Sequence, residues 1–413
     1  MSLFLVTFFL IYGSVHAYAL LKAKSALGFG WGTVLGLCPL LALLVAAPLV
    51  VFYLARHGME GGARVVSWIG YTWMGLLFFF FWMSLAVDAA NLAVRVAGAL
   101  TGRWIIPHLV AGRAPFLALA GLAAAFGAYA IFEAGHIRVE RVRIASDKLP
   151  AAAAPLRIAQ ISDVHLGLIV RHGRTRAIAD AIRRENPDLL VSTGDLVDGE
   201  INHLEGLAEI LREIDPPLGK YAVTGNHEYY AGLGQALAFT RSAGFTVLRG
   251  ESVTLGNGMR IAGVDDPAGA AFGANNPRSE AAALGEAPSP AFTLFLKHRP
   301  WLSGTSRGLF DLQLSGHTHA GQLFPFRLLV RITYPLLSGL RPLAGGGFLY
   351  TSRGTGTWGP PMRFLSPPEV TILEIAGRGE PGKVFKDKRA GAGNNNSVSL
   401  NAAINFKKTR RIA

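Results

Sequence analysis

The stretch Arg157–His165 reads R-I-A-Q-I-S-D-V-H, a short apolar run that ends in an aspartate and a histidine. Its apolar residues predict a β-strand, and a strand that ends in Asp-x-His directs a carboxylate and an imidazole to the same side. These two side chains, Asp163 and His165, are of types that divalent metal ions accept as ligands. The stretch therefore predicts a pair of metal-binding residues at the carboxyl end of a strand.

The same arrangement recurs four times along the chain, each time at the predicted end of an apolar run. The later stretches are Ser192-Thr193-Gly194-Asp195, Thr224-Gly225-Asn226-His227-Glu228, Leu296-Lys297-His298 and Ser315-Gly316-His317-Thr318-His319. In open α/β sheets, sites lie at the carboxyl ends of the strands, so we expect two Asp, one Asn and five His to share one rim. A mixed set of nitrogen and oxygen donors favours Mn, Fe or Zn over Ca or Mg.

From residue 157 onward, short β-rich runs alternate with amphipathic stretches, which predicts an α/β domain with a layered sheet. The predicted strands are 157–162, 189–193, 221–224, 260–264, 292–296, 312–315, 348–352 and 370–374. The predicted helices are 174–184, 203–214 and 233–243. Residues 378–413 are rich in Gly, Lys and Asn, and this composition predicts a disordered basic tail.

The first third of the chain is a different kind of sequence. Hydrophobic residues make up 51% of the chain and charged residues 16%, and the apolar residues concentrate before residue 136. Four runs approach or exceed the roughly 20 residues that span a bilayer as a helix: 3–21, 34–55, 68–92 and 116–134. A cleaved signal peptide is the alternative for the first run, but that run has no Lys or Arg at its start. We therefore predict a multi-pass transmembrane region over residues 1–140.

The chain carries a formal net charge of +13, which fits the surface of an acidic membrane better than nucleic acid once membrane segments are predicted. Basic residues flanking the spans slightly favour a cytoplasmic catalytic domain. On the side shared with that domain they are Arg56, Arg64, Arg138, Arg141, Arg143 and Lys148. On the other side they are Lys22, Lys24, Arg103 and Arg113, with Arg95 if the third helix ends early.

Taken in order, the five strand-end stretches resemble the calcineurin-like metallophosphoesterases, whose pattern is D-x-H, G-D, G-N-H-D/E, H and G-H-x-H. The resemblance covers residues 157–375. Three further stretches, 263–266, 316–322 and 352–356, look like the membrane-attached bacterial branch of that family. The resemblance implies a four-layer α-β-β-α sandwich over residues 150–377, preceded here by an all-α transmembrane region of about four helices. The four apolar runs lie outside the match, and they themselves predict a multi-pass protein, which we expect in a bacterial inner membrane.

The resemblance further implies two divalent metal ions, with Mn favoured and Fe or Zn as alternatives. One metal would be bound by Asp163, His165, Asp195 and His319. The other would be bound by Asp195, Asn226, His298 and His317, so that Asp195 bridges the two. The reaction implied is attack on phosphorus by a hydroxide that bridges the metals. His227 is then the candidate that protonates the leaving oxygen, and Glu228 either orients His227 or is a solvated acid at a helix start.

Three features leave alternatives open. The apolar segment 324–348, with three interspersed arginines, is either an interfacial element lying on the bilayer or a core loop. Asp198 is either a partner of the site or a loop acid. Arg353 and Arg363 are candidates for pairing with a substrate phosphate, although the sequence does not place them.

These observations predict a membrane-anchored hydrolase of a phosphoester or phosphoanhydride, acting on a lipid-linked or membrane-surface substrate. One alternative is a tethered phosphodiesterase for soluble substrates. Another is a scaffold or sensor without catalysis, for which we would expect a degenerate site, whereas every element of the motif is present. The single cysteine, Cys38, excludes a disulfide within the chain. The sequence predicts no oligomeric state.

Overall fold

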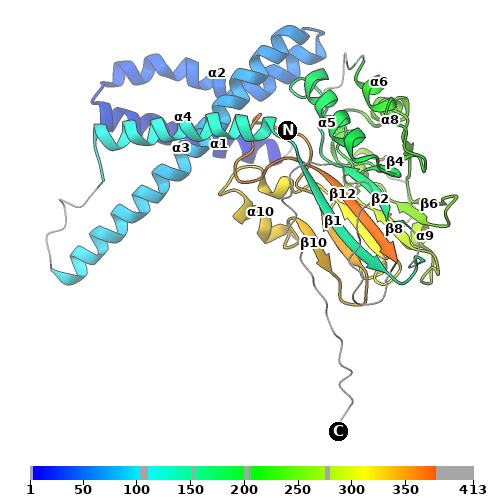
Figure 1. Cartoon of the computed structure of the whole chain (residues 1–413). Helices are drawn as coiled ribbons and strands as arrows, with labels where there is room; N and C mark the ends of the chain where they lie inside the picture. Colours follow the sequence, from blue (N-terminus) through cyan, green and yellow to red (C-terminus); the bar gives the residue numbers. More distant parts are fainter. Residues whose placement is uncertain are drawn as a thin grey trace.

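The computed structural model describes residues 3–102, 110–150, 154–199, 204, 206–274 and 280–377 (Figure 1). Within these ranges, a bundle of long helices is followed by a two-sheet sandwich, and the two parts lie side by side. The predicted tail after residue 377, and His203 in a predicted helix, lie outside the described residues.

Four helices form the bundle, at the places where the apolar runs predicted them. They are α1 (Leu3–Leu27), α2 (Trp31–Arg56), α3 (Glu60–Thr101) and α4 (Arg113–Gly135). All four are long and apolar enough to cross a membrane. They extend beyond the predicted runs because a hydropathy pattern detects only the part of a helix that matches the hydrocarbon core.

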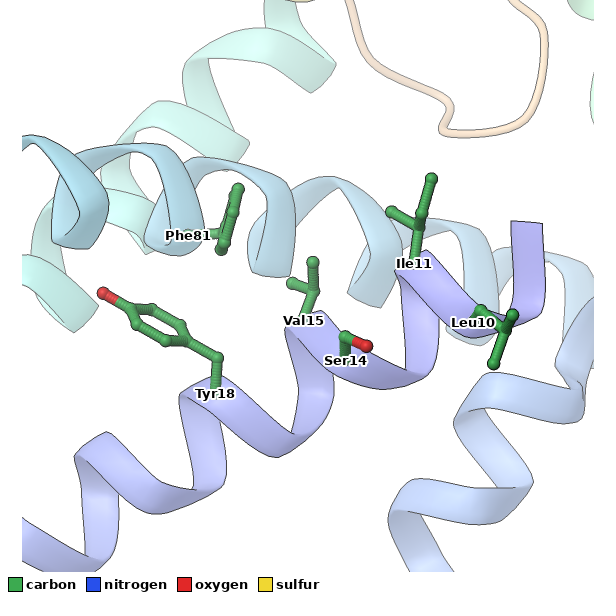
Figure 2. Close-up of a pocket in the computed structure, with 6 residues that line it drawn as sticks. All are labelled: Leu10, Ile11, Ser14, Val15, Tyr18 and Phe81. Carbon is green, nitrogen blue, oxygen red and sulfur yellow. The ribbon is translucent and has the colours of Figure 1, made fainter. Parts of the chain in front are cut away.

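The outer surface of the bundle is apolar. Leu10 is 66% exposed, Leu35 69% and Ile69 60%, which is the expected pattern when lipid rather than water surrounds the helices. An apolar pocket of about 440 Å³ opens between α1 and α3 (Figure 2). Inside the bundle, the close approach of Gly70 to Ala47 shows how small residues let helices α2 and α3 pack closely.

The second part of the chain is a sandwich of two six-stranded sheets. The first sheet has the order β1-β12-β2-β3-β4-β5 and the second the order β10-β11-β9-β8-β7-β6. The strands of the first sheet are β1 (Arg138–Ser146), β2 (Leu156–Ile161), β3 (Leu189–Ser192), β4 (Lys220–Ala222), β5 (Thr246–Val247) and β12 (Glu369–Gly377). Those of the second are β6 (Glu251–Thr254), β7 (Arg260–Gly263), β8 (Thr293–Leu296), β9 (Leu312–Ser315), β10 (Gly339–Pro342) and β11 (Phe348–Thr351).

The alternation of side chains along each strand builds the layers. Ile158 of β2 faces the core between the two sheets, and its neighbour Ala159 faces the core under the helices. The outer helices of the first sheet are α5 (His172–Glu185), α6 (Leu207–Arg212) and α8 (Leu233–Ser242), and the second sheet is covered by α9 (Glu280–Leu284). The predicted four-layer α-β-β-α fold, preceded by apolar helices, is confirmed.

Strand β1 was not predicted, although it joins the two parts of the molecule. Only His136 and Ile137 separate the end of α4 from β1, which pairs in parallel with β12. The positive charges of Arg141 and Arg143 were expected to lie near the membrane. Arg141 instead pairs with Glu185, and Arg143 with Glu374, on the surface of the sandwich.

The apolar segment 324–348 divides into a helix and a strand. Its first half contains α10 (Arg327–Thr333), which has no buried residue, and its second half contains β10. Helix α10 lies between the bundle and the sandwich (Figure 1). The ring of Phe326, just before α10, contacts Phe78 of α3 with 6.5 Å between centroids.

Candidate metal centre

The predicted ligands lie at the carboxyl ends of five strands, as the sequence predicted. Asp163 and His165 follow β2, and Asp195 follows β3. Asn226 follows β4 and also caps the short helix α7 (His227–Tyr230). His298 follows β8, and His317 and His319 follow β9, beside the short 3-10 helix η3 (His319–Gly321). The two sheets therefore bring these seven side chains together.

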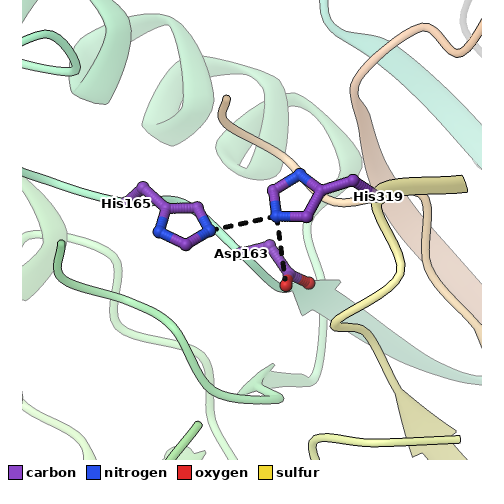
Figure 3. Close-up of side chains that lie close together, drawn as sticks. All are labelled: Asp163, His165 and His319. Carbon is purple, nitrogen blue, oxygen red and sulfur yellow. Dashed lines mark hydrogen bonds and ion pairs between the residues drawn. The ribbon is translucent and has the colours of Figure 1, made fainter. Parts of the chain in front are cut away.

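One group of potential ligands consists of Asp163, His165 and His319 (Figure 3). All three side chains are buried, and their ligand atoms lie within 4.8 Å of one another. His165 Nε2 lies 3.0 Å from His319 Nε2, which in turn lies 3.5 Å from Asp163 Oδ1. The nitrogen and oxygen atoms thus converge on a single point, as the ligands of a metal ion do.

A second group consists of Asp195, His298 and His317. Asp195 Oδ2 lies 3.2 Å from His298 Nε2, and His298 Nε2 lies 3.1 Å from His317 Nδ1. The same Asp195 oxygen lies 3.9 Å from His165 Nε2 of the first group. Asp195 therefore stands between the two groups, in a position to serve both.

The backbone at these residues is unusual. A positive φ is uncommon for residues other than glycine and costs about 1–3 kcal/mol where it must be held. Five of the seven candidate ligands have one: Asp163 (51°), His165 (53°), Asp195 (50°), His317 (69°) and His319 (48°). Such conformations cluster where surrounding structure imposes them for function.

Glycines permit the close approach of the ligand loops. A Cβ atom at Gly316 would overlap Ser162 Oγ and Asp163 Oδ2, and one at Gly225 would overlap Asp195 Oδ1. Only glycine leaves room for these carboxylates beside a neighbouring backbone. Gly225 and Gly316, which directly precede the candidate ligands Asn226 and His317, are therefore required for steric reasons.

Unpaired atoms and neighbouring contacts test whether these residues suit a metal. Asn226 Oδ1 is buried without a hydrogen-bond partner, and a buried polar atom of this kind costs free energy unless something else binds it. The other ring nitrogen of His298, Nδ1, lies 2.8 Å from Thr193 O and so donates to it, which leaves Nε2 free to act as a ligand. Two backbone contacts from His317 N–H, at 2.9 and 3.0 Å, hold the Asp163 carboxylate. The donor set fits divalent metal ions.

The pKa values of two candidate ligands, His165 and His319, also favour metal binding. Burial, followed by the nearby His227, lowers the pKa of His165 to about 4. Burial and the Arg363 guanidinium hold the pKa of His319 well below its usual value. Both rings are therefore neutral near pH 7, which is the form in which imidazole binds a metal ion. Burial alone would lower the pKa of His298, but the Asp195 carboxylate outweighs it and raises that pKa to about 10, so His298 must release a proton when it binds a metal ion.

The partner of His227 is Asp198 rather than the expected Glu228. His227 Nδ1 lies 2.9 Å from Asp198 Oδ1. Burial alone would lower the pKa of His227, but the Asp195 and Asp198 carboxylates outweigh it and raise that pKa to about 9. Of the two alternatives left open for Asp198, the structure thus favours a role beside the site.

The interpretation of Glu228 as a solvated acid was wrong. Its side chain is buried rather than solvated, and its carboxylate accepts the backbone N–H groups of Asp195 at 3.0 Å, Leu196 at 2.8 Å and Gly225 at 2.6 Å. The sequence could not show this, because the three donors belong to two separate strand-end loops. Glu228 fastens those loops to each other.

The two arginines considered as phosphate ligands are engaged elsewhere. Arg363 is completely buried, and Arg353 pairs with Glu369 and Glu140. Aromatic rings that no sequence motif marks lie beside the centre instead. Tyr230 and Trp358 lie 5.1 and 5.8 Å from the ring of His227, and Tyr334 lies 5.2 Å from that of His317.

Comparisons with known proteins identify the family of this chain. A family described as calcineurin-like phosphoesterase matches residues 156–321. An uncharacterized metallophosphoesterase of Aquifex aeolicus is 44% identical over 259 residues, which are 62% of this chain and 99% of that protein. The chain therefore belongs to the calcineurin-like phosphoesterases, a family of enzymes that depend on a pair of metal ions.

A second relative concerns the membrane. A protein of Danio rerio named transmembrane protein with metallophosphoesterase domain is 32% identical over 249 residues, which are 58% of this chain and 57% of that protein. Together with the four apolar helices, this likeness supports association with a membrane. Among solved structures, a dimetal phosphatase from Danio rerio matches with a TM-score of 0.32 and 15% identity, over 49% of this chain and 88% of that one.

Proposed function

We propose that this chain is a membrane-anchored hydrolase that uses two divalent metal ions to cleave a phosphoester or phosphoanhydride. One metal is held by Asp163, His165, Asp195 and His319. The other is held by Asp195, Asn226, His298 and His317. The observation that carries this proposal is the pair of ligand groups, buried except for the half-buried His317, with Asp195 between them.

The residues beside the proposed metals have defined tasks. When bound, two metal ions stabilise the attacking and the leaving oxygen of an in-line displacement at phosphorus. Because Asp198 holds Nδ1 of His227, the Nε2 atom is left to donate a proton to the leaving oxygen. Asp195 Oδ1 accepts the backbone N–H of His227 at 2.8 Å, which fixes this ring relative to the centre. Glu228 acts only through the backbone that it holds. Mn is the favoured metal, with Fe or Zn as alternatives.

The proposed substrate carries its phosphate on a lipid or another group at the membrane surface. Helix α10 supports this because it links the apolar bundle to the centre. At one end, Phe326 contacts Phe78 of α3, and at the other Tyr334 contacts His317. Between them, Leu328 is 57% and Ile332 is 77% exposed, with Arg327 and Arg331 on the same helix. An exposed apolar helix with basic residues beside membrane helices is typical of an element that lies in the bilayer interface.

A soluble substrate is the second candidate, and one observation favours it. Tyr230 and Trp358, beside His227, are each 51% exposed, and exposed rings of this kind stack on nucleobases. The alternative enzyme is a tethered phosphodiesterase of a soluble nucleotide. In both cases we propose that the membrane region, predicted over residues 1–140, ends with α4. The catalytic domain then begins with β1, earlier than the predicted residue 150, and runs to residue 377. We propose that this domain faces the cytoplasm of a bacterial cell.

Elemental analysis of the purified protein, combined with hydrolysis assays, tests the proposed function. We expect about two metals per chain and Mn-dependent hydrolysis of bis-p-nitrophenyl phosphate. A panel of lipid phosphates and soluble nucleotides in mixed micelles then identifies the substrate class. Protein that binds no metal and shows no turnover after reconstitution would favour the scaffold or sensor.

The contribution of α10 is tested with Ile332→Glu and Leu328→Glu, which place charges on its exposed apolar surface. We expect turnover of lipid phosphates in vesicles to fall several-fold, because each buried carboxylate costs free energy at the interface, whereas hydrolysis of bis-p-nitrophenyl phosphate stays unchanged. Glu286→Gln, at a position on the sandwich, is the control. Equal activity of all variants on lipid substrates would contradict a role of α10 in reaching lipid.

A further inference from the structure

Arg363 is a buried cation next to the candidate metal centre. The segment that carries it contacts both the helical bundle and the site. The side chain of Arg363 is 0% exposed. A buried guanidinium is costly unless its donors are satisfied, and here backbone carbonyl groups accept them. Its Nε donates to Gly356 O at 3.0 Å, and its Nη1 donates to His319 O at 3.1 Å and to Arg353 O at 2.6 Å.

Among the candidate ligands, Arg363 makes its closest contacts with His319. Besides the bond to His319 O, Arg363 Nη2 lies 3.1 Å from Nδ1 of the His319 ring. Ser366 Oγ also donates to His319 O, at 2.8 Å. His319 has a φ of 48°, a conformation that relaxes unless neighbours hold it. Arg363 thus contacts both the backbone and the ring of His319, on the side away from His165.

The backbone of Arg363 is attached to the helical bundle. Its N–H donates to Ala130 O, in the last turns of α4, at 2.9 Å. Three residues on, the N–H of Ser366 lies 3.4 Å from Oε2 of Glu133, a buried side chain of the same helix. Two points of attachment therefore join this segment to α4.

The residues on either side of Arg363 insert between helices α3 and α4. Met362 is 0% exposed, and it packs so closely on Gly75 of α3 that a Cβ there would overlap its sulfur atom. The ring of Phe364 lies 5.0 Å from those of Phe79 in α3 and Phe126 in α4. A change in the packing of α3 against α4 must therefore move the segment that carries Arg363.

We propose that Arg363 is a positioning residue for His319, and that helices α3 and α4 set its place, so that the membrane bundle forms part of the scaffold of the metal centre. This inference rests on the proposed function, since it assumes that His319 binds a metal. It gives the bundle a task beyond anchoring. Packing between α3 and α4 then determines how well one of the two metal positions is formed.

The experiment is a titration of the full-length protein in detergent micelles with Mn²⁺, in which free Mn²⁺ is followed by its electron paramagnetic resonance signal. Gly75→Ala pushes Met362 away from α3 without touching the site, and Met362→Ala removes the inserted side chain. Gly121→Ala is the matched control, because this glycine lies inside α4 and has nothing within 4 Å of an added Cβ. Arg363→Lys tests the positioning residue itself.

We expect Gly75→Ala, Met362→Ala and Arg363→Lys each to weaken one of the two Mn²⁺ sites by about 10-fold or more, the usual range for residues that orient a ligand, while the other site and the Gly121→Ala protein stay unchanged. Selective loss of one site separates positioning from general destabilisation. Two sites of unchanged affinity in the first three variants would overturn the inference and leave the proposed function intact. Equal weakening of both sites would also overturn it. An unaltered protein that binds no Mn²⁺ would overturn the proposed function and this inference together.

Discussion

The helical bundle and the sandwich reach their structures in opposite ways. In the bundle, large apolar residues such as Leu35 face outward, and small residues such as Gly70 allow the helices to meet. In the sandwich, apolar residues lie inside, and buried polar residues gather where strands end. Many apolar residues serve equally well at a lipid-facing position, whereas each side chain of the candidate centre has one task. The two regions should therefore differ sharply in their tolerance of substitution.

The largest effect is expected from removing Asp195 and His317 together. The double variant Asp195→Asn, His317→Ala takes the shared carboxylate and one imidazole from the centre, so it should lose both metals, and turnover should fall to background. Elemental analysis and Mn-dependent hydrolysis measure this, and circular dichroism checks that the sandwich is still folded. Full turnover by this variant would show that the site assignment is wrong.

A smaller loss should follow His227→Ala. General acid catalysis contributes about 10²- to 10⁴-fold, so kcat should fall by that factor for substrates with poor leaving groups. The loss should be smaller for p-nitrophenyl esters, because p-nitrophenolate needs no proton to leave. Metal content should stay at the level of the unaltered protein. If His227→Ala instead loses metal, this residue is a ligand, as its nearness to His165 and Asp195 also permits.

Next in size is Gly316→Ala, which tests the steric argument. The added Cβ would overlap Asp163 Oδ2, so the carboxylate must move and metal affinity should fall by about 10- to 100-fold. Gly304→Ala is the matched control, because an added Cβ at Gly304 has nothing within 4 Å. Metal titration of the two variants compares them directly. Equal affinities would mean that the loop relaxes at no cost.

The smallest effect is expected at the surface of the bundle. Leu35 on α2 is 69% exposed, so Leu35→Ala should change the free energy of unfolding by no more than about 0.5 kcal/mol and leave activity unchanged. Thermal unfolding in micelles, with activity measured in parallel, provides the check. A large destabilisation would reveal a packing partner for α2 and would weaken the contrast between the two regions.

The sequence predicted features that depend on local pattern. Each of the four apolar runs lies within an observed helix, because hydropathy is a property of consecutive residues. The strand-end motifs also placed the candidate ligands, because a short apolar strand followed by Asp or His is visible locally. Strand β1 was missed because its arginines interrupt the apolar pattern by which the other strands were predicted. Its partner β12 lies more than 200 residues away.

Contacts between distant segments could not be predicted, because a sequence pattern describes only neighbouring residues. The bond between His227 and Asp198 joins two loops, and no repeat or spacing in the sequence marks it. Likewise, nothing around Arg363 in the sequence indicates that its side chain contacts His319 or that its backbone bonds to α4. Motifs identify which residues take part in a site, whereas the neighbours that orient them follow only from the fold.

The junction between α4 and β1 has a consequence for kinetics. Only His136 and Ile137 separate the last membrane helix from a strand that is paired along its length with β12. A linker this short lets the sandwich neither swing nor reach far from α4, so the distance between the centre and the proposed membrane helices is fixed. If the substrate is a lipid, as proposed above, its encounter with the centre becomes a search in two dimensions. The relevant concentration is molecules per unit area, and diluting the substrate with inert lipid should slow the enzyme even when its total amount is constant.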